Sequence, residues 1–287
     1  MNMRDLQKKA LEICCYVCGA GAFSVFIRWL QFMQAFDEQG LVDKSFFNFL
    51  VPAMLLASAL LFVRIIDGLR RERYYIPEDF YEAFRNQGRL YTIIRWVLGL
   101  VMVAGSVMLL ISSETDKNAD ILKLLSAAGV VTGFCLPLLL SCANKPHVAN
   151  RGMVCFCSFM PILFFCVWLV ACYMTNAINP VVWGYGLEIV TVIIAMLAFF
   201  RVAGFAFGVV KTWRCMFLTM LGADICIMAI ADERYMGMQL MLFAAAMTQA
   251  LYVWILVCNL KRGEKQPVQH PNDGFERLND AEILNRD

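Results

Sequence analysis

The strongest constraint on this chain is the recurrence of apolar runs that are long enough to cross a lipid bilayer. The hydrocarbon core of a membrane requires about 20 mainly apolar residues per helix. Hydrophobic residues make up 60% of the 287 residues and charged residues 17%, more apolar surface than a soluble fold of this length would bury. We therefore predict an all-α, polytopic integral membrane protein in contact with the lipid bilayer, with about eight transmembrane helices near 11–34, 46–68, 91–112, 121–142, 153–175, 181–203, 212–231 and 237–260.

Successive connections between these runs alternate in charge. Basic residues precede the first run and occupy every second connection, for example around 70–73 and 145–151, whereas the connections at 37–43 and 114–120 are acidic. The positive-inside rule then places both termini in the cytoplasm. We predict a location in the cell membrane. The chain has no Asn-x-Ser/Thr acceptor for glycosylation, which favours a bacterial inner membrane. A net charge of +2 gives no electrostatic basis for binding nucleic acid.

We expect three regions along the chain. Residues 1–143 hold membrane helices one to four, residues 144–262 hold helices five to eight, and residues 263–287 form a disordered cytoplasmic tail, because they are polar and contain two prolines. The stretch Ala20-Gly21-Ala22 resembles a signal-peptidase site, but the apolar run continues to about Gln34, so we expect it to remain as the first helix.

Residues 76–88 are predicted to form an amphipathic helix on the cytoplasmic surface. Pro77 suits a first helical turn, Phe80 and Phe84 share one face, and Gly88 would end the helix. A simple linker is the alternative. The match of Phe62-Val63-Arg64-Ile65 with Phe199-Phe200-Arg201-Val202 suggests a parallel four-plus-four repeat, although short apolar matches also arise by chance.

Ionisable residues inside the runs are the first candidates for a functional site, because charge in a bilayer is costly. Arg28 in the first run and Glu188 in the sixth lie at a similar depth from the outer edge. They could form an outward-facing gate or substrate clamp. They could equally form a purely structural ion pair, or Arg28 could extend its guanidinium to the interface.

Asp224 is a carboxylate near the middle of the seventh run, and Thr248 and Gln249 lie near the middle of the eighth. Burial disfavours the charged form of a carboxylate, which makes Asp224 the best candidate for coupling to an ion or a proton. Its structural alternative is a hydrogen bond that joins two helices through Gln249.

The twelve cysteines lie almost entirely in apolar runs, so a disulfide-stapled outer domain is not expected. Cys15 and Cys18 form a single C-x-x-C at the cytoplasmic start of the first run and are weak candidates for metal or redox chemistry. Cysteine is also a common small hydrophobic residue in helix packing, so we expect no metal site and no cofactor.

Absent motifs exclude several functions. The two histidines, His147 and His270, lie outside the apolar runs, so a haem held by paired histidines within the membrane is excluded. No nucleotide-binding loop and no His-Glu-x-x-His motif occurs, and a cytoplasmic-side membrane enzyme that uses thiols is less favoured than two other hypotheses. Two hypotheses remain. One is a small-solute or ion transporter with a pathway along Asp224, Gln249, Thr248, Arg28 and Glu188; the alternative is a non-catalytic membrane subunit that binds a protein partner through its cytoplasmic face and tail.

Overall fold

The computed structural model describes residues 3–34, 47–85, 88–115, 118–144, 150–176, 182–232 and 234–263. The predicted tail beyond residue 263, His147 and the acidic connection at 37–43 lie outside these ranges. Within them, eight helices are long and apolar enough to cross a membrane, which confirms the predicted all-α architecture. The spans are α1 (Met3–Gln34), α2 (Phe47–Arg71), α4 (Arg89–Ser112), α5 (Ala119–Ala143), α6 (Arg151–Asn176), α7 (Val182–Phe207), α8 (Thr212–Ala229) and α9 (Met236–Cys258).

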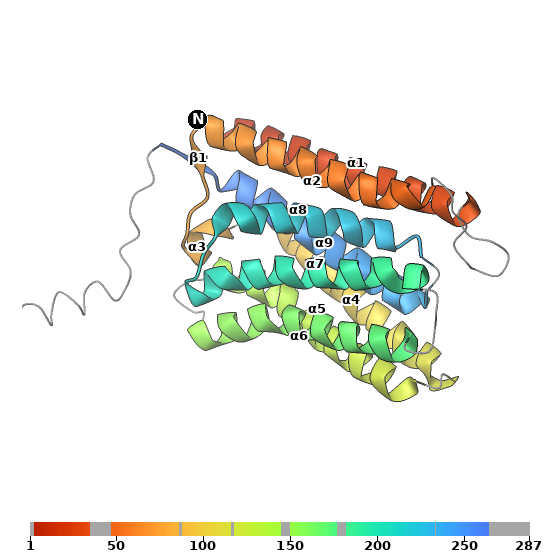
Figure 1. The fold of residues 1–287 in the computed structure, drawn as a ribbon. Helices are drawn as coiled ribbons and strands as arrows, with labels where there is room; N and C mark the ends of the chain where they lie inside the picture. The colour runs from red at the N-terminus through yellow and green to blue at the C-terminus, as the bar shows by residue number, and fades with distance from the viewer. Residues whose placement is uncertain are drawn as a thin grey trace, which may run out of the picture.

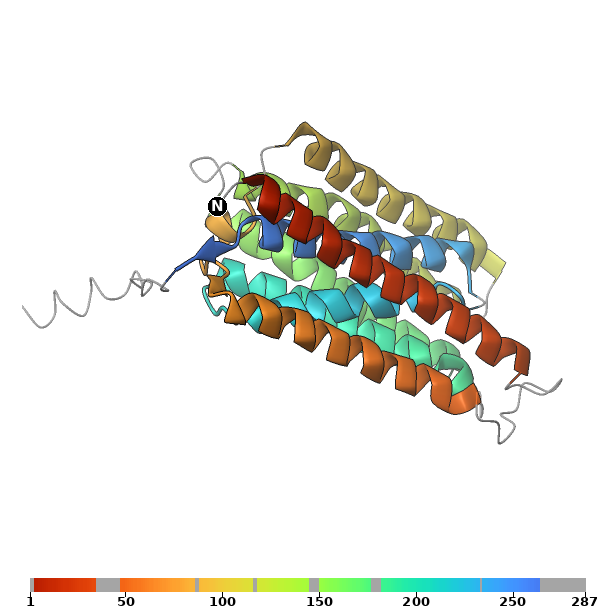
Figure 2. The same ribbon diagram turned by 90° about the horizontal axis from the view of Figure 1, so that it is seen from above.

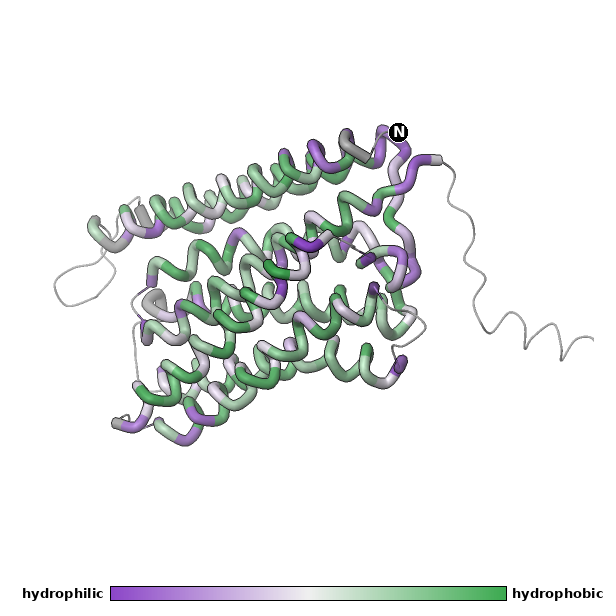
Figure 3. The backbone as a smooth tube through the Cα atoms, turned by 180° about the vertical axis from the view of Figure 1, so that it is seen from behind, coloured by the Kyte–Doolittle hydropathy of each residue, from purple (hydrophilic) through white to green (hydrophobic). Residues whose placement is uncertain are grey.

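Apolar residues line the length of these helices, and hydrophilic residues concentrate toward their ends (Figure 3). One helix end shows how the chain leaves a span. Gly208 has a φ of +77°, and the Val209 amide donates to the Gly204 carbonyl at 2.9 Å, a Schellman ending that stops α7. Glycine is required at this position because a side chain would be strained at that φ.

Six of the spans form a closed ring. Each of α4 to α8 packs against the next helix in the chain, and α9 closes the ring by packing against both α8 and α4. Helix α1 lies against α8 and α9, and α2 lies beside α1 on the outside, so the two form a layer on one side of the ring (Figures 1 and 2). The first four spans therefore divide between this layer and the ring. The predicted repeat and the division at residue 143 stay predictions.

The chain between α2 and α4 covers the end of the ring at which the N-terminus lies, here called the N-terminal end. Strand β1 (Tyr74–Tyr75) pairs antiparallel with β2 (Lys261–Arg262), and the short helix α3 (Phe80–Ala83) follows. The Asn259 side chain donates to the carbonyl oxygens of Ala83 and Arg85 at 2.8 and 2.9 Å. These contacts hold the segment from residue 74 to residue 85 across the end of the bundle.

This covering segment differs from the amphipathic surface helix predicted over 76–88. The helix is four residues long, and Phe80 and Phe84 are 4% and 1% exposed. The Phe84 ring meets Phe205 of α7 and Tyr252 of α9 edge-on, with centroids 5.2 and 5.6 Å apart. The two phenylalanines thus enter the bundle because its open end offers more apolar contact than the membrane surface.

Glycine pairs allow α4 to approach its two ring neighbours closely. A Cβ on Gly237 of α9 would lie 2.4 Å from the Gly105 carbonyl oxygen of α4. A Cβ on Gly99 of α4 would likewise lie 2.4 Å from the Gly133 carbonyl oxygen of α5. Small residues at such crossings let helix backbones pack together in a membrane, where the hydrophobic effect contributes little.

Replacing Gly237 by alanine should therefore destabilise the ring. We expect Gly237→Ala to lower the free energy of unfolding by roughly 1–3 kcal/mol, the usual cost of overpacking, measured by SDS titration in mixed micelles. Gly19→Ala in α1 is the matched control, because nothing lies within 4 Å of a Cβ there. Equal stability of the two variants would contradict close packing between α4 and α9.

Candidate functional site

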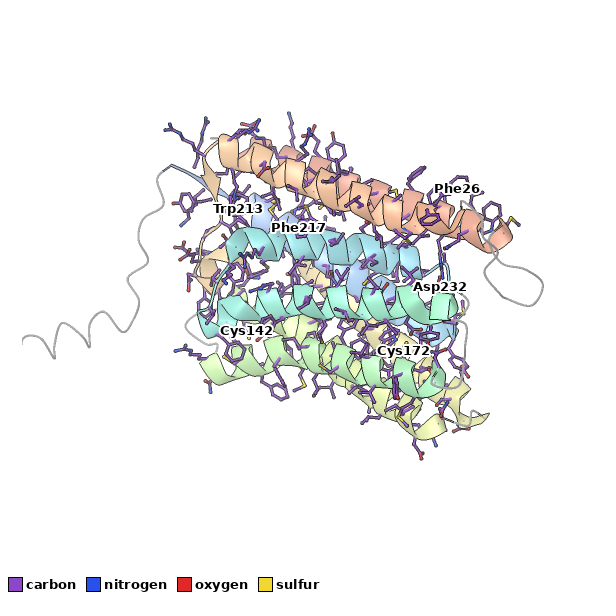
Figure 4. All side chains as sticks on the ribbon, in the orientation of Figure 1. Phe26, Cys142, Cys172, Trp213, Phe217 and Asp232 are labelled. Carbon is purple, nitrogen blue, oxygen red and sulfur yellow. The ribbon has the colours of Figure 1, made fainter. Side chains whose placement is uncertain are left out.

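Four charged side chains form a buried chain of contacts at the end of the bundle opposite the N-terminus, around Asp232 (Figure 4). Arg28 of α1 donates through Nε to Asp232 Oδ1, and Arg234 donates through Nη2 to Asp232 Oδ2, both at 2.7 Å. Arg234 Nε lies 3.5 Å from Glu188 Oε2 of α7. The indole Nε1 of Trp168 in α6 donates to Glu188 Oε1 at 2.7 Å.

These contacts connect four parts of the fold that are distant in the sequence. Asp232 and Arg234 belong to the short connection between α8 and α9. The Gln239 side chain of α9 holds this connection by donating to the Asp232 carbonyl oxygen at 3.0 Å. Gln31 Oε1 accepts from Arg28 Nη1 at 2.5 Å, one turn along α1. All four ionic side chains are at most 9% exposed, so they depend on one another for charge compensation.

The structure brings Arg28 and Glu188 into one network, as their similar depth suggests, but each pairs with a different residue. The ion-pair partner of Arg28 is Asp232, and that of Glu188 is Arg234. Sequence reasoning missed Asp232 and Arg234, because they stand in a connection rather than in an apolar run. The shortness of that connection could have identified them. Because few residues join α8 to α9, the side chains of Asp232 and Arg234 must stay near the ends of these helices.

A cavity of about 540 Å³ borders this network on the ring side. Glu188 and Arg234 contribute its charged groups, and Thr175 and Asn176 at the end of α6 add polar ones. Arg234 Nη1 is buried and has no hydrogen-bond partner among the described residues. Arg234 therefore lines the cavity and retains one unused donor, close to the Glu188 carboxylate. Its remaining lining comes from Leu122, Ala171, Cys172, Tyr235 and Met238.

A second cavity, of about 270 Å³, lies on the other side of the network between α1, α2 and α7. Arg28 and Gln31 contribute its polar groups, and the remaining lining residues are Val51, Pro52, Leu55, Gly186, Leu187 and Val190. It is thus a mostly apolar space beneath a layer of two helices. Of these two cavities, the larger one combines both signs of charge.

From Trp168, which donates to the cavity residue Glu188, a column of aromatic rings runs to Phe84 at the N-terminal end. Trp168 stacks with Phe165, and Phe165 stacks with Phe199, with centroids 6.1 and 5.6 Å apart. Phe199 then meets Tyr252 edge-on at 6.1 Å, and Tyr252 meets Phe84 of the covering segment. Each of these rings is at most 2% exposed, so the column closes the interior of the ring.

Asp224 lies deeper in the bundle and faces α1 and α2. Ser24 Oγ of α1 donates to Asp224 Oδ1 at 3.2 Å, while Oδ2 is buried without a hydrogen-bond partner in the described chain. Ser58 of α2 lies beside the same carboxylate, outside hydrogen-bond geometry. The fully buried Asp224 therefore has one satisfied oxygen and one that could take a proton or a cation.

Gln249 and Thr248 of α9 do not join this carboxylate. The Gln249 amide lies against Gly222 on another side of α8, and neither its nitrogen nor its oxygen has a described hydrogen-bond partner. Thr248 donates to the Ala244 carbonyl of its own helix at 2.7 Å. The alternative in which Asp224 joins two helices through Gln249 is therefore replaced by a contact between α8 and α1.

The cysteines of the described chain are free thiols, Cys15 and Cys18 among them. No group of three or more His, Cys, Asp or Glu side chains in the described ranges is arranged to hold a metal ion. The metal interpretation of the C-x-x-C thus gains no support from the neighbouring elements.

Comparisons of the chain with models of protein families, with curated proteins and with solved structures gave no match. The fold and its buried polar groups nevertheless define the class of protein. Eight helices are long and apolar enough to cross a membrane, and buried ion pairs join side chains of α1, α7 and the α8–α9 connection. The chain is a multi-pass α-helical integral membrane protein.

The bridge through Asp232 makes a specific prediction about stability. Asp232→Asn leaves two buried arginines with one carboxylate and should cost roughly 3–5 kcal/mol of unfolding free energy, and Arg28→Met should cost a similar amount. The double variant retains the neutral Arg234–Glu188 pair. Its loss of unfolding free energy should therefore be well below the sum of the losses in the two single variants.

SDS titration of the wild type, both single variants and the double variant measures this coupling as a double-mutant cycle. Lys261→Gln is the control, because Lys261 forms an exposed ion pair with Glu82 that should contribute at most about 1 kcal/mol. Strictly additive losses for Arg28→Met and Asp232→Asn would contradict the bridge.

Proposed function

We propose that this protein is a permease for a small polar solute, which enters through the larger cavity. The observation that carries the proposal is a cavity of about 540 Å³ lined by both Glu188 and Arg234. Solute sites are typically enclosed spaces of roughly 300–1,000 Å³ with a few convergent polar groups. The basic connections predict that the N-terminal end faces the cytoplasm, so the cavity would face outward.

The aromatic column supports a closed state of such a pathway. A solute that left the cavity toward the N-terminal end would have to pass Phe199, Tyr252 and Phe84. Phe84 belongs to the covering segment, a connection between α2 and α4 that is held in place by the β1–β2 pair and by Asn259, which follows the last residue of α9. In the proposal, this segment and the aromatic column form the barrier on the cytoplasmic side, and the cavity is open to solute from the outside.

Transport can be measured with a mixture of solutes offered together. Proteoliposomes containing the purified protein are incubated with a small-molecule extract of cells, washed and analysed by mass spectrometry against empty liposomes. We expect at least one solute to accumulate with the wild type. Met238→Trp, which fills the cavity, should reduce that accumulation by about tenfold or more, since the occluded site would bind little solute.

The matched control is Tyr173→Trp, because Tyr173 lies on the same α6 turn as the cavity residues but is 72% exposed on the outer surface of the bundle. It should transport like the wild type. Accumulation equal to that of empty liposomes by folded wild-type protein would refute the permease. Equal loss in both tryptophan variants would remove the cavity from the pathway.

Asp224 supplies a coupling site in this proposal. Its unpartnered Oδ2 and the neighbouring Ser58 hydroxyl form a buried place for a proton or a sodium ion. We predict that Asp224→Asn abolishes accumulation driven by an imposed H⁺ or Na⁺ gradient, while solute exchange without a gradient remains. Asp67→Asn, at an exposed position of α2, is the control. Unchanged gradient-driven uptake by Asp224→Asn would exclude this role.

The alternative, a non-catalytic membrane subunit, would depend on a partner. Phe80 and Phe84 are buried within the bundle and offer no surface for it. The predicted tail would then carry the contact. A protein that co-purifies in stoichiometric amount and is lost on deletion of 264–287, together with absent solute uptake, would favour this alternative.

A further inference from the structure

The charges around the larger cavity restrict which solutes it can hold, and this inference rests on the proposed function. Arg28, Asp232, Arg234 and Glu188 carry two positive and two negative charges, so the network is neutral as a whole. A solute with a net charge would add an uncompensated charge to a site whose ionic side chains are at most 9% exposed. A solute with no net charge avoids that cost.

The contact between Arg234 and Glu188 leaves part of the hydrogen-bonding capacity of both side chains unused. Their closest approach, 3.5 Å from Nε to Oε2, is longer than the 2.7–2.9 Å of a strong charge-assisted hydrogen bond. Arg234 donates Nη2 to Asp232, whereas its buried Nη1 has no described partner. A carboxylate on the solute would give this donor an acceptor. Glu188 Oε1 and Oε2 each retain lone pairs that could accept from an ammonium group.

We propose that the cavity binds a zwitterion of the α-amino acid type, with its carboxylate on Arg234 and its ammonium group on Glu188. The two protein groups are adjacent, which suits a solute whose ammonium and carboxylate groups are attached to the same carbon atom. The apolar lining of Leu122, Ala171 and Met238 offers contact to a small aliphatic side chain.

Thermal unfolding in detergent with added probes tests the class of solute, because a ligand that binds the folded state raises the unfolding temperature. The probes are glycine, L-alanine and L-leucine, compared with sodium acetate and methylammonium chloride at equal concentration and ionic strength. We expect a saturable rise with at least one amino acid. Neither acetate nor methylammonium, each carrying one half of the zwitterion, should produce it.

Variants assign the two charges. Arg234→Lys keeps the positive charge but loses the fork of donors, and Glu188→Gln removes the acceptor charge; each should weaken amino acid binding by roughly tenfold to a hundredfold. Met238→Trp leaves both charges intact and should also remove the response, which separates binding from damage to the ionic network. Lys261→Gln, at the opposite end, should respond like the wild type.

The outcomes separate this inference from the permease itself. An equal rise with acetate or methylammonium alone would overturn the zwitterion, and so would accumulation of only a singly charged solute by proteoliposomes. Amino acid binding without uptake would support the site and overturn transport. Loss of the response in Lys261→Gln together with the cavity variants would place binding elsewhere and overturn the assignment.

Discussion

The carboxylate of Asp232 is the contact on which the charged end of the bundle depends. Each of its oxygens accepts from a different arginine, Arg28 on α1 and Arg234 beside α9, so two positive charges share one negative charge. Glu188 then balances the remaining positive charge. In a low-dielectric interior no member can be removed without leaving another unpaired. The positions of α1, α7 and the α8–α9 connection are therefore determined together, and the larger cavity takes its charged groups, Glu188 and Arg234, from this network.

The two ends of the ring differ in how the space between the helices is filled. At the N-terminal end, Phe84 fills the space between helices with an aromatic ring and continues the column through Tyr252 and Phe199. At the other end, side chains of both charges leave a cavity open. An aromatic pair contributes about 0.5–1.5 kcal/mol beyond its buried area, whereas removing one partner of a buried ion pair costs about 3–5 kcal/mol. If the protein changes conformation, the column and its covering segment are thus better suited to rearrange than the network.

Sequence patterns were sufficient for the spans and insufficient for their contacts. Apolar length identifies each transmembrane helix, because the thickness of the bilayer sets it. Depth counting placed Arg28 and Glu188 at one level, and they do share a network, but depth does not give the angle around the bundle at which each side chain points. The same limit applied to Phe80 and Phe84. Their spacing indicated one apolar face, which the ring interior covers instead of the membrane surface.

Helix α1 links the two candidate sites physically. Ser24 and Arg28 lie one turn apart on one face of α1; Ser24 contacts Asp224 in the last third of α8, and Arg28 contacts Asp232 beyond the end of α8. Binding at Asp224 would act directly on the first contact. Binding at Arg234 would act on the second, because Arg234 shares the Asp232 carboxylate with Arg28. Any movement of α1 along α8 must change both contacts. If the proton or cation bound at Asp224 and the solute bound at Arg234 both favour the same position of α1, each raises the affinity of the protein for the other. Thermodynamic linkage requires the two factors to be equal.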